Sequence, residues 1–190
     1  MRKKRIVIGL TGFIAAGKGT VVELLKNEFG FTGYSTSDRV REAARAAGSK
    51  NPTRELMQAI GNEMQERFGG DIFAKIIAGM IWAEQNDHVV VDSIRHPEEY
   101  VFFAQYPYFV MLAVTAPFEE RFRRVQSRSR AGDPKTIQEF YAIDQRDQGV
   151  GQDLSGQQVK RCVELADYTL ENKDTREEFE QQVRDFLALL

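Results

Sequence analysis

Short, continuously apolar runs alternate along the chain with longer segments in which apolar residues recur every three or four positions. Continuous apolar character is typical of strands covered on both faces of a parallel sheet, whereas the longer spacing predicts helices with one buried face. The predicted strands are Arg5–Leu10, His88–Asp92, Tyr108–Val114 and Tyr168–Leu170. The predicted helices are 21–29, 56–68, 72–81, 118–125 and 175–187. Their alternation predicts a three-layer α/β/α fold with a parallel sheet.

Length and composition are those of one ordinary globular domain, with 190 residues of which 42% are hydrophobic and 28% charged. A formal charge of −2 gives no global field that attracts nucleic acid or an anionic membrane. No apolar run approaches the roughly 20 residues that span a bilayer, and Cys162, the only cysteine, cannot form an internal disulfide. We therefore expect a single domain over 1–190, a cytoplasmic monomer or homodimer, with neither a membrane nor a nucleic acid as the favoured partner.

A glycine-rich segment lies between the first predicted strand and the first predicted helix. It reads Gly12-Phe-Ile-Ala-Ala-Gly17-Lys18-Gly19-Thr20 and fits the G-x-x-x-x-G-K frame. In that frame backbone N–H groups surround a phosphate, the helix N-terminus adds positive potential, and the lysine reaches the outer phosphates. The segment therefore predicts a nucleotide site for ATP with Mg²⁺. Its candidate residues are Gly12, Ala15, Ala16, Gly17, Lys18, Gly19 and Thr20.

The residue after the lysine is Gly19, where a hydroxyl that touches Mg²⁺ usually stands, and Thr20 follows it. This Gly-Lys-Gly-Thr form resembles that of adenylate kinases and related nucleoside monophosphate kinases, whose magnesium is held largely through water. The resemblance implies a P-loop NTPase fold with a helical acceptor-binding insert at about 35–85 and a short lid at about 127–158. Magnesium would then be held by Thr20 and a further carboxylate through water.

The segment Tyr34-Ser-Thr36-Ser-Asp38-Arg-Val-Arg41 resembles the Ser-Thr-Gly-Asp-x-Leu-Arg segment of adenylate kinases. By that resemblance Thr36 and Arg41 contact the acceptor nucleotide, and Asp38 lies near the reacting phosphates. A plain helix N-cap at 35–38 with a solvated Arg41 is the alternative.

Asp92-Ser-Ile-Arg95 is similar to the Asp-Gly-Phe-Pro-Arg of the same family, although it is one residue shorter and lacks the proline. The resemblance puts Asp92 near the metal and Arg95 on the acceptor phosphate. A carboxylate that leaves a strand beside the phosphate loop can hold magnesium through water, and a guanidinium can grip a phosphate with paired hydrogen bonds. A structural salt bridge between the two residues is the alternative.

Five arginines fall within ten residues, and on a helix Arg121, Arg124 and Arg128 share one face. The five are Arg121, Arg123, Arg124, Arg128 and Arg130. The pair Arg124-x-x-x-Arg128 resembles the adenylate-kinase helix that opens the lid, which implies that Arg124 packs on the donor base and Arg128 reaches the phosphates. Ser127–Gln158 has only a brief apolar pattern, so we expect a weakly anchored helical excursion. Within it, Arg146-Asp147 resembles the Arg-Asp of the cytidylate-kinase lid and makes Arg146 a second phosphate-contact candidate. A solvated or RNA-binding basic stripe is the alternative.

Together these resemblances imply Mg-ATP-dependent phosphoryl transfer to a nucleoside or deoxynucleoside monophosphate, with Lys18, Asp92, Arg128 and Arg146 as catalytic residues. One alternative is a dephospho-CoA kinase, because 166–172 resembles the Ala-Asp-x-x-Ile-x-Asn of that family. That reaction phosphorylates a ribose hydroxyl and calls for a general base such as Asp38. The other alternative is an ATP-binding switch or RNA-associated ATPase.

Overall fold

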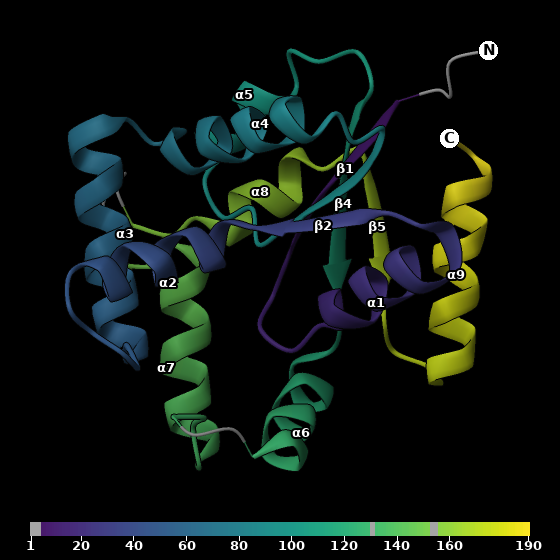
Figure 1. Ribbon diagram of the computed structural model, residues 1–190. Helices are drawn as coiled ribbons and strands as arrows, with labels where there is room; N and C mark the ends of the chain where they lie inside the picture. Colours follow the sequence, from purple (N-terminus) through teal and green to yellow (C-terminus); the bar gives the residue numbers. More distant parts are fainter. Residues whose placement is uncertain (1–4, 130–131, 153–155) are drawn as a thin grey trace.

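The computed structural model describes residues 5–129, 132–152 and 156–190, and in this part of the chain five parallel strands form one sheet (Figure 1). The order across the sheet is β2-β3-β1-β4-β5, with β1 at its centre. The strands are β1 Ile6–Gly12, β2 Thr32–Ser35, β3 His88–Asp92, β4 Phe109–Thr115 and β5 Tyr168–Glu171. The predicted parallel α/β/α fold is confirmed.

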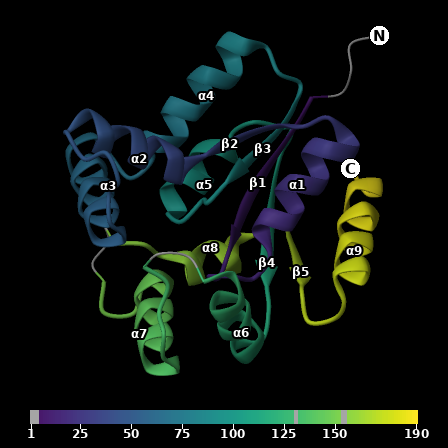
Figure 2. The same cartoon turned by 60° about the horizontal axis from the view of Figure 1, so that its bottom comes forward.

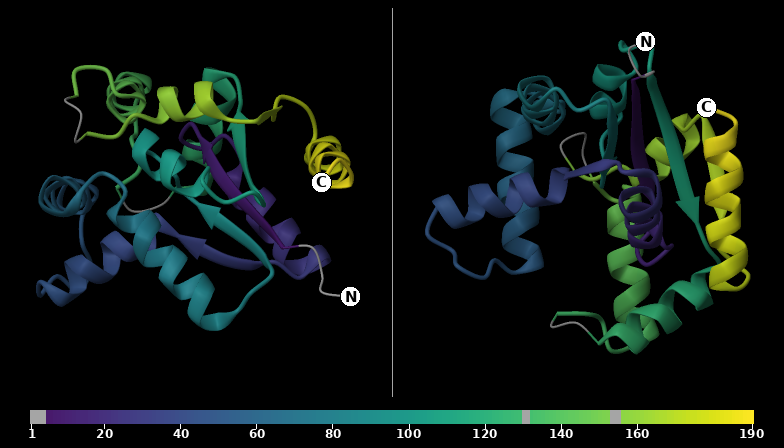
Figure 3. Two further views of the ribbon diagram at one scale, coloured as in Figure 1. Left: turned by 90° about the horizontal axis from the view of Figure 1, so that it is seen from above. Right: turned by 45° about the vertical axis from the view of Figure 1, so that its right-hand side comes forward.

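Two apolar cores cover the two faces of the sheet, as alternate residues of each strand point to opposite sides. Ile8 and Leu10 of β1 pack with α1 Lys18–Phe29 and α9 Arg176–Ala188. Val7 of β1 packs on the other face with α4 Ile72–Glu84, α5 Pro97–Phe103 and α8 Val159–Leu165. The sheet is thus the middle of three layers, and Figure 3 shows α9 at the β5 side of the molecule, away from α2 and α3.

The remaining helices lie outside these layers, beyond the carboxyl ends of the strands. They are α2 Thr36–Ala46, α3 Arg54–Phe68, α6 Phe118–Arg128 and α7 Ile137–Gln148. Figures 1 and 2 show α2 and α3 together on one side, with α6 and α7 side by side below the sheet. No helix in the described ranges is long and apolar enough to cross a membrane.

Local capping rules explain where several helices begin. Thr175 accepts a hydrogen bond from the backbone N–H of Glu178, and the Glu178 carboxylate accepts one from the N–H of Thr175, at 3.2 and 3.0 Å. This capping box confirms the predicted start of the C-terminal helix. Gly30 ends α1 with a φ of 69°, a left-handed conformation that glycine adopts without strain.

The structure differs from the sequence-based expectations in three places. The segment around Tyr34 forms the edge strand β2, because its backbone pairs with β3 although its sequence is polar. The short helices α5 and α8 were not predicted, because neither segment has a helical repeat of apolar residues. The expectation of weak anchoring for 127–158 is wrong for α7, since Phe140 is fully buried and its ring lies 5.1 and 5.5 Å from those of Phe118 and Phe122.

Candidate active site

A cavity of about 1150 Å³ opens where β1 and β3 end. The phosphate loop lines one part of it, α2 and α3 line another, and residues from the start of α5 and from α6 and α7 complete it. Ligands of open α/β sheets bind at this edge, because the loops that follow the strands converge there. The cavity is therefore the candidate active site.

Backbone conformation gives the phosphate loop its shape. Gly12 and Gly17 have φ values of 138° and 118°, and a Cβ at Gly12 would collide with the carbonyl oxygen of Val114 on the neighbouring strand. A Cβ at Gly17 would collide with the side-chain amide of Asn172. Both positions therefore require glycine, whereas Ala15 adopts a left-handed φ of 58° despite its methyl group. Strain of this kind is typical of ligand-binding loops.

Lys18 reaches back over this loop. Its ammonium donates to the backbone oxygens of Gly12 and Phe13, at 2.7 and 3.0 Å. Burial lowers the pKa of Lys18 from 10.5 to about 8, while the nearby Asp92 carboxylate acts in the opposite direction. Because burial disfavours this charge and its two printed hydrogen bonds go to neutral carbonyls, the ammonium would gain from a bound phosphate.

Asp92 ends β3 beside this lysine. Its Oδ1 is buried and has no hydrogen-bond partner among the residues that the structure describes. An orphaned carboxylate oxygen next to a phosphate loop fits a hydrated magnesium ion, which prefers oxygen ligands and keeps several waters. Thr20 also lines the cavity. Ser93, the next residue after the aspartate, has a left-handed φ of 69°, at the position where the similar adenylate-kinase segment has glycine.

The residues predicted to bind the acceptor differ in whether they line the cavity and in the contacts that they make. Thr36 is 5% exposed, and its hydroxyl donates to the backbone oxygen of Ser93 at 2.5 Å, so it fastens α2 to the end of β3. Arg41 lines the cavity and forms an ion pair with Asp38. Asp38 itself is half-exposed and does not line the cavity.

Arg95 lines the cavity and is held in place by residues far along the chain. With its amide oriented to satisfy both neighbours, Gln157 accepts from Nη1 of Arg95 at 2.9 Å and donates to Oδ1 of Asp147 at 3.2 Å. The backbone N–H of Gln158 also donates to the oxygen of Arg95 at 2.9 Å. Gln157 has no signal in the sequence, because it meets Arg95 only after distant parts of the chain have packed together.

Arg124 is held against the back of the phosphate loop. Its guanidinium donates to the backbone oxygen of Ala16 at 3.2 Å and to both oxygens of Asn172 at 3.0 Å. Desolvation lowers the pKa of Arg124. The side chain therefore joins the loop to the segment after β5 and lines the cavity at the same time.

The other two predicted arginines differ in position. Arg128 lines the cavity and forms a two-pronged ion pair with Asp133, with both N–O distances 2.8 Å. Arg146 is not among the lining residues, and its Nε is buried without a hydrogen-bond partner in the described structure. Arg130 lies outside the described residues.

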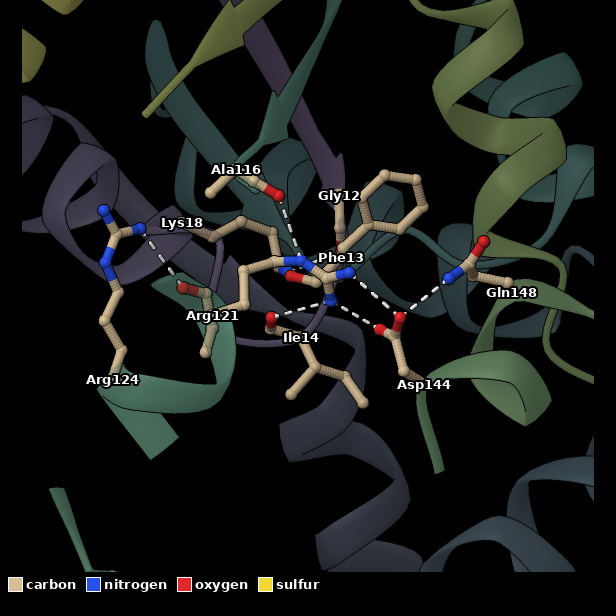
Figure 4. Close-up of polar contacts among 10 residues, drawn as sticks. Gly12, Phe13, Ile14, Lys18, Ala116, Arg121, Arg124, Asp144 and Gln148 are labelled. Atoms are coloured by element: carbon tan, nitrogen blue, oxygen red, sulfur yellow. Dashed lines mark hydrogen bonds and ion pairs between the residues drawn. The ribbon is translucent and has the colours of Figure 1, made fainter. Parts of the chain in front are cut away.

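Arg121, which the sequence analysis placed on the face of Arg124, is the centre of a network that sequence reasoning missed (Figure 4). Its guanidinium donates to the backbone oxygens of Ala116 and Ile14 at 3.1 and 3.3 Å, and to the carboxylate of Asp144. It also lies 5.1 Å from the centre of the Phe13 ring. The network joins the phosphate loop, β4 and the two helices α6 and α7.

Two buried titratable residues at the start of α5 also line the cavity. Burial raises the pKa of Glu99 to about 7, and the backbone N–H groups of Arg95 and His96 donate to its Oε2 at 2.9 and 3.2 Å. Burial lowers the pKa of His96 to about 4, with a smaller effect in the same direction from the Arg95 charge. The imidazole is therefore neutral near pH 7.

Comparison with known proteins agrees with this geometry. The family described as AAA domain matches residues 8–145, which include the phosphate loop, the acceptor segment and the arginine helix. A UPF0200 protein of Hyperthermus butylicus is 32% identical over 98% of this chain and 95% of its own length. The chain belongs to the AAA domain family and to the UPF0200 proteins.

Solved structures share the fold of this UPF0200 protein. Shikimate kinase of Aquifex aeolicus superposes with a TM-score of 0.58 at 17% identity, covering 96% of both chains. The protein TT1252 of Thermus thermophilus superposes with a TM-score of 0.56 at 23% identity, covering 99% of both chains. At these identities the likeness shows a common fold, which one of the two shares as a shikimate kinase.

Proposed function

We propose that this UPF0200 protein is a Mg-ATP-dependent nucleotide kinase, which transfers the γ-phosphoryl group of ATP to a nucleoside or deoxynucleoside monophosphate. One observation carries the proposal: the phosphate loop with Lys18 and the acceptor candidates Arg41 and Arg95 line the same cavity. A site that only bound or hydrolysed ATP would have no use for these two further arginines.

The size of the cavity supports two ligands rather than one. Sites for single small molecules commonly measure about 300–1,000 Å³. The present cavity measures about 1150 Å³ and extends from the phosphate loop to α3. A donor and an acceptor can therefore be bound together, as direct transfer between them requires.

Each part of the proposed reaction falls to a group of this chain. Lys18 and the loop N–H groups hold the β- and γ-phosphates, while Arg41 and Arg95 bind the acceptor phosphate. An oxygen of the acceptor phosphate attacks the γ-phosphorus, the bond to the β,γ-bridging oxygen breaks, and ADP leaves with that electron pair. Bound Mg²⁺, held by Asp92 and Thr20 through water, would neutralise charge on the phosphate oxygens. Arg128 adds positive charge at the transferred group.

The ribose-hydroxyl alternative has less support. That reaction calls for a general base, and the sequence offered Asp38 for this role. Asp38 pairs with Arg41 and does not line the cavity. The proposal gives no role to Arg146, which also lies outside the cavity lining.

A coupled assay of ADP release tests the proposal, with ATP, Mg²⁺ and one acceptor at a time. The acceptors are the ribo- and deoxyribonucleoside monophosphates, dephospho-CoA and shikimate, with acceptor-free and RNA-containing reactions beside them. We expect turnover to depend on at least one monophosphate. Turnover with dephospho-CoA or shikimate alone, or acceptor-independent hydrolysis alone, would contradict the proposal.

Two variants separate donor from acceptor chemistry in the same assay. Lys18→Ala should lower kcat by several orders of magnitude and leave the thermal unfolding curve intact, because the lysine neutralises charge that develops in transfer. Arg95→Ala should chiefly raise the KM of the acceptor. Arg123→Ala is the matched control, since that arginine is 70% exposed and pairs with Glu120 outside the cavity. An unchanged acceptor KM in Arg95→Ala would contradict the assignment of the phosphate clamp.

A further inference from the structure

Helix α3 presents a row of carboxamides to the cavity. Gln58, Asn62 and Gln65 stand four and three positions apart, so they share one face of the helix, and all three line the cavity. The charged residues Glu63 and Glu66 of the same helix are exposed and do not line it. The side of α3 that meets a ligand is therefore polar but uncharged.

Gln65 is fixed at the inner end of this row. It is 6% exposed, and its Nε2 donates to the backbone oxygen of Gly70 at 3.4 Å. Gly70 in turn lies against Glu98 at the start of α5, where an added Cβ would come within 3.1 Å of the Glu98 side chain. The carboxamide row thus runs towards the first turn of α5, which directly follows Arg95.

His96, which directly precedes α5, adds another uncharged polar group. His96 is 4% exposed and lines the cavity, and its Nδ1 has no hydrogen-bond partner among the described residues. A buried imidazole nitrogen without a partner is costly unless a ligand satisfies it. The imidazole is neutral at pH 7, because burial lowers the pKa of His96 to about 4. It can therefore accept or donate one hydrogen bond and does not attract an anion.

The cationic residues of the cavity and the carboxamides of α3 come from different elements. Its cations lie at the phosphate loop, at Arg41 and Arg95 and along α6, whereas α3 contributes carboxamides and the apolar side chain of Met57. Phe73 of α4, which is 2% exposed, adds an aromatic ring. Among the described side chains of α3 that line the cavity, an acceptor with a second anionic group would meet no cation, and Glu99 lines the same cavity. A flat, uncharged group with several hydrogen-bond donors and acceptors would match the carboxamides of α3.

We propose that the carboxamides Gln58, Asn62 and Gln65, together with His96, form the subsite that recognises the nucleobase of the acceptor. This inference rests on the proposed function and deepens it, because it names the uncharged heterocycle as the part of the acceptor that sets specificity. Carboxamides pair with the donor and acceptor edges of bases, and a site built for such bonds discriminates against analogues that lack them. The phosphate would then anchor on Arg95, one residue before His96.

Binding to the full chain without ATP tests the inference independently of turnover. Isothermal titration compares each common nucleoside monophosphate with ribose 5-phosphate, which keeps the phosphate and the sugar but has no base. We expect at least one nucleotide to bind roughly tenfold more tightly than ribose 5-phosphate, as two hydrogen bonds in a desolvated site would give.

Three single variants then remove one carboxamide each, namely Gln58→Leu, Asn62→Leu and Gln65→Leu. Leucine keeps a similar volume but cannot form the hydrogen bonds. We expect at least one of them to lower the preference for the nucleotide by about fivefold or more while affinity for ribose 5-phosphate stays within twofold. The retained affinity for ribose 5-phosphate shows that the variant is folded. Gln181→Leu on the exposed face of α9 is the matched control and should change neither affinity.

The outcomes separate the two proposals. If all three variants keep the nucleotide preference within twofold, the nucleobase subsite is overturned, while monophosphate turnover in the coupled assay would leave the kinase proposal standing. If no nucleotide binds more tightly than ribose 5-phosphate, the subsite is overturned as well. Only the additional absence of monophosphate-dependent turnover would overturn the proposed function.

Discussion

The guanidinium of Arg121 and the carboxylate of Asp144 meet inside the protein, with N–O distances of 2.5 and 2.9 Å and side chains 5% and 1% exposed. This pair fastens α7 to α6, and Arg121 also holds the backbone oxygen of Ile14 in the phosphate loop. The nucleotide loop and the helix that carries Asp147 are therefore parts of one rigid network (Figure 4).

Breaking this pair should destabilise the protein strongly. Asp144→Ala leaves the Arg121 charge buried without its carboxylate, so we expect the free energy of unfolding to fall by about 3–5 kcal/mol. Arg121→Met combined with Asp144→Leu should cost less than the sum of the two single replacements, because no charge is left uncompensated. Urea denaturation measures both effects. Glu120→Ala removes an exposed partner of Arg123 and should change stability by less than about 1 kcal/mol. Equal losses in Asp144→Ala and Glu120→Ala would contradict the proposed role of the pair.

Asp133 forms an ion pair with Arg128, the arginine that we assign to the transferred phosphate. Both oxygens of Asp133 bind Arg128, so an incoming triphosphate must displace them. Asp133→Asn should therefore lower the Kd of ATP, by roughly two- to fivefold, since a partly exposed ion pair contributes little more than that. Fluorescence titration with a labelled nucleotide measures the change. Glu28→Gln, which weakens a similar two-pronged pair with Arg184 on the far surface, should leave the Kd unaltered. Weaker nucleotide binding in Asp133→Asn would count against the phosphate role of Arg128.

Gln157 should set how well Arg95 is oriented for the acceptor. Removal of its amide in Gln157→Ala should raise the acceptor KM roughly threefold at an unchanged kcat, as one hydrogen bond to the guanidinium is lost. Gln157→Glu should raise the KM further, because its carboxylate competes with the acceptor phosphate for Arg95. Steady-state kinetics with the acceptor as the varied substrate distinguish the two. Gln105→Ala, at an exposed position in the turn that follows α5, is the control. A lower kcat at constant KM would assign Gln157 to the chemical step instead.

Glu99 should make stability depend on pH. Burial raises the pKa of Glu99 from 4.5 in an exposed carboxyl to about 7 in the folded protein, so folding favours the protonated form. This contribution to stability is complete below about pH 4.5 and is lost as the pH rises through 7. The stability of the wild type relative to Glu99→Gln should fall across that window by an amount on the order of 3 kcal/mol. Urea denaturation at several pH values measures this difference. The titration of His96 is common to both proteins and therefore cancels. A difference that stays constant with pH would show that folding does not shift the pKa of Glu99.

Much of what the sequence predicted depends on residues that are close to one another along the chain. The strand-loop-helix unit at Gly12–Thr20 was recognisable because a phosphate loop needs its residues within nine consecutive positions. The start of the C-terminal helix was recognisable for the same reason, since Thr175 and Glu178 are three residues apart. Buried strands were visible wherever both faces are covered, but β2 was not, because its pairing with β3 and not its own hydrophobicity makes it a strand.

The sequence by itself determined the fold class, the nucleotide loop and the arginines at 41, 95 and 128 that line the cavity with it. Only the tertiary structure decided which groups accompany them: Arg121 pairs with Asp144, Arg95 bonds to Gln157, and the carboxamides of α3 line the same cavity as His96. It also placed Asp38 and Arg146 outside the cavity lining. The reason is physical. Hydrogen bonds within a loop or a helical turn depend on neighbouring residues, whereas pairs separated by 23 or more positions form only when whole elements pack against one another.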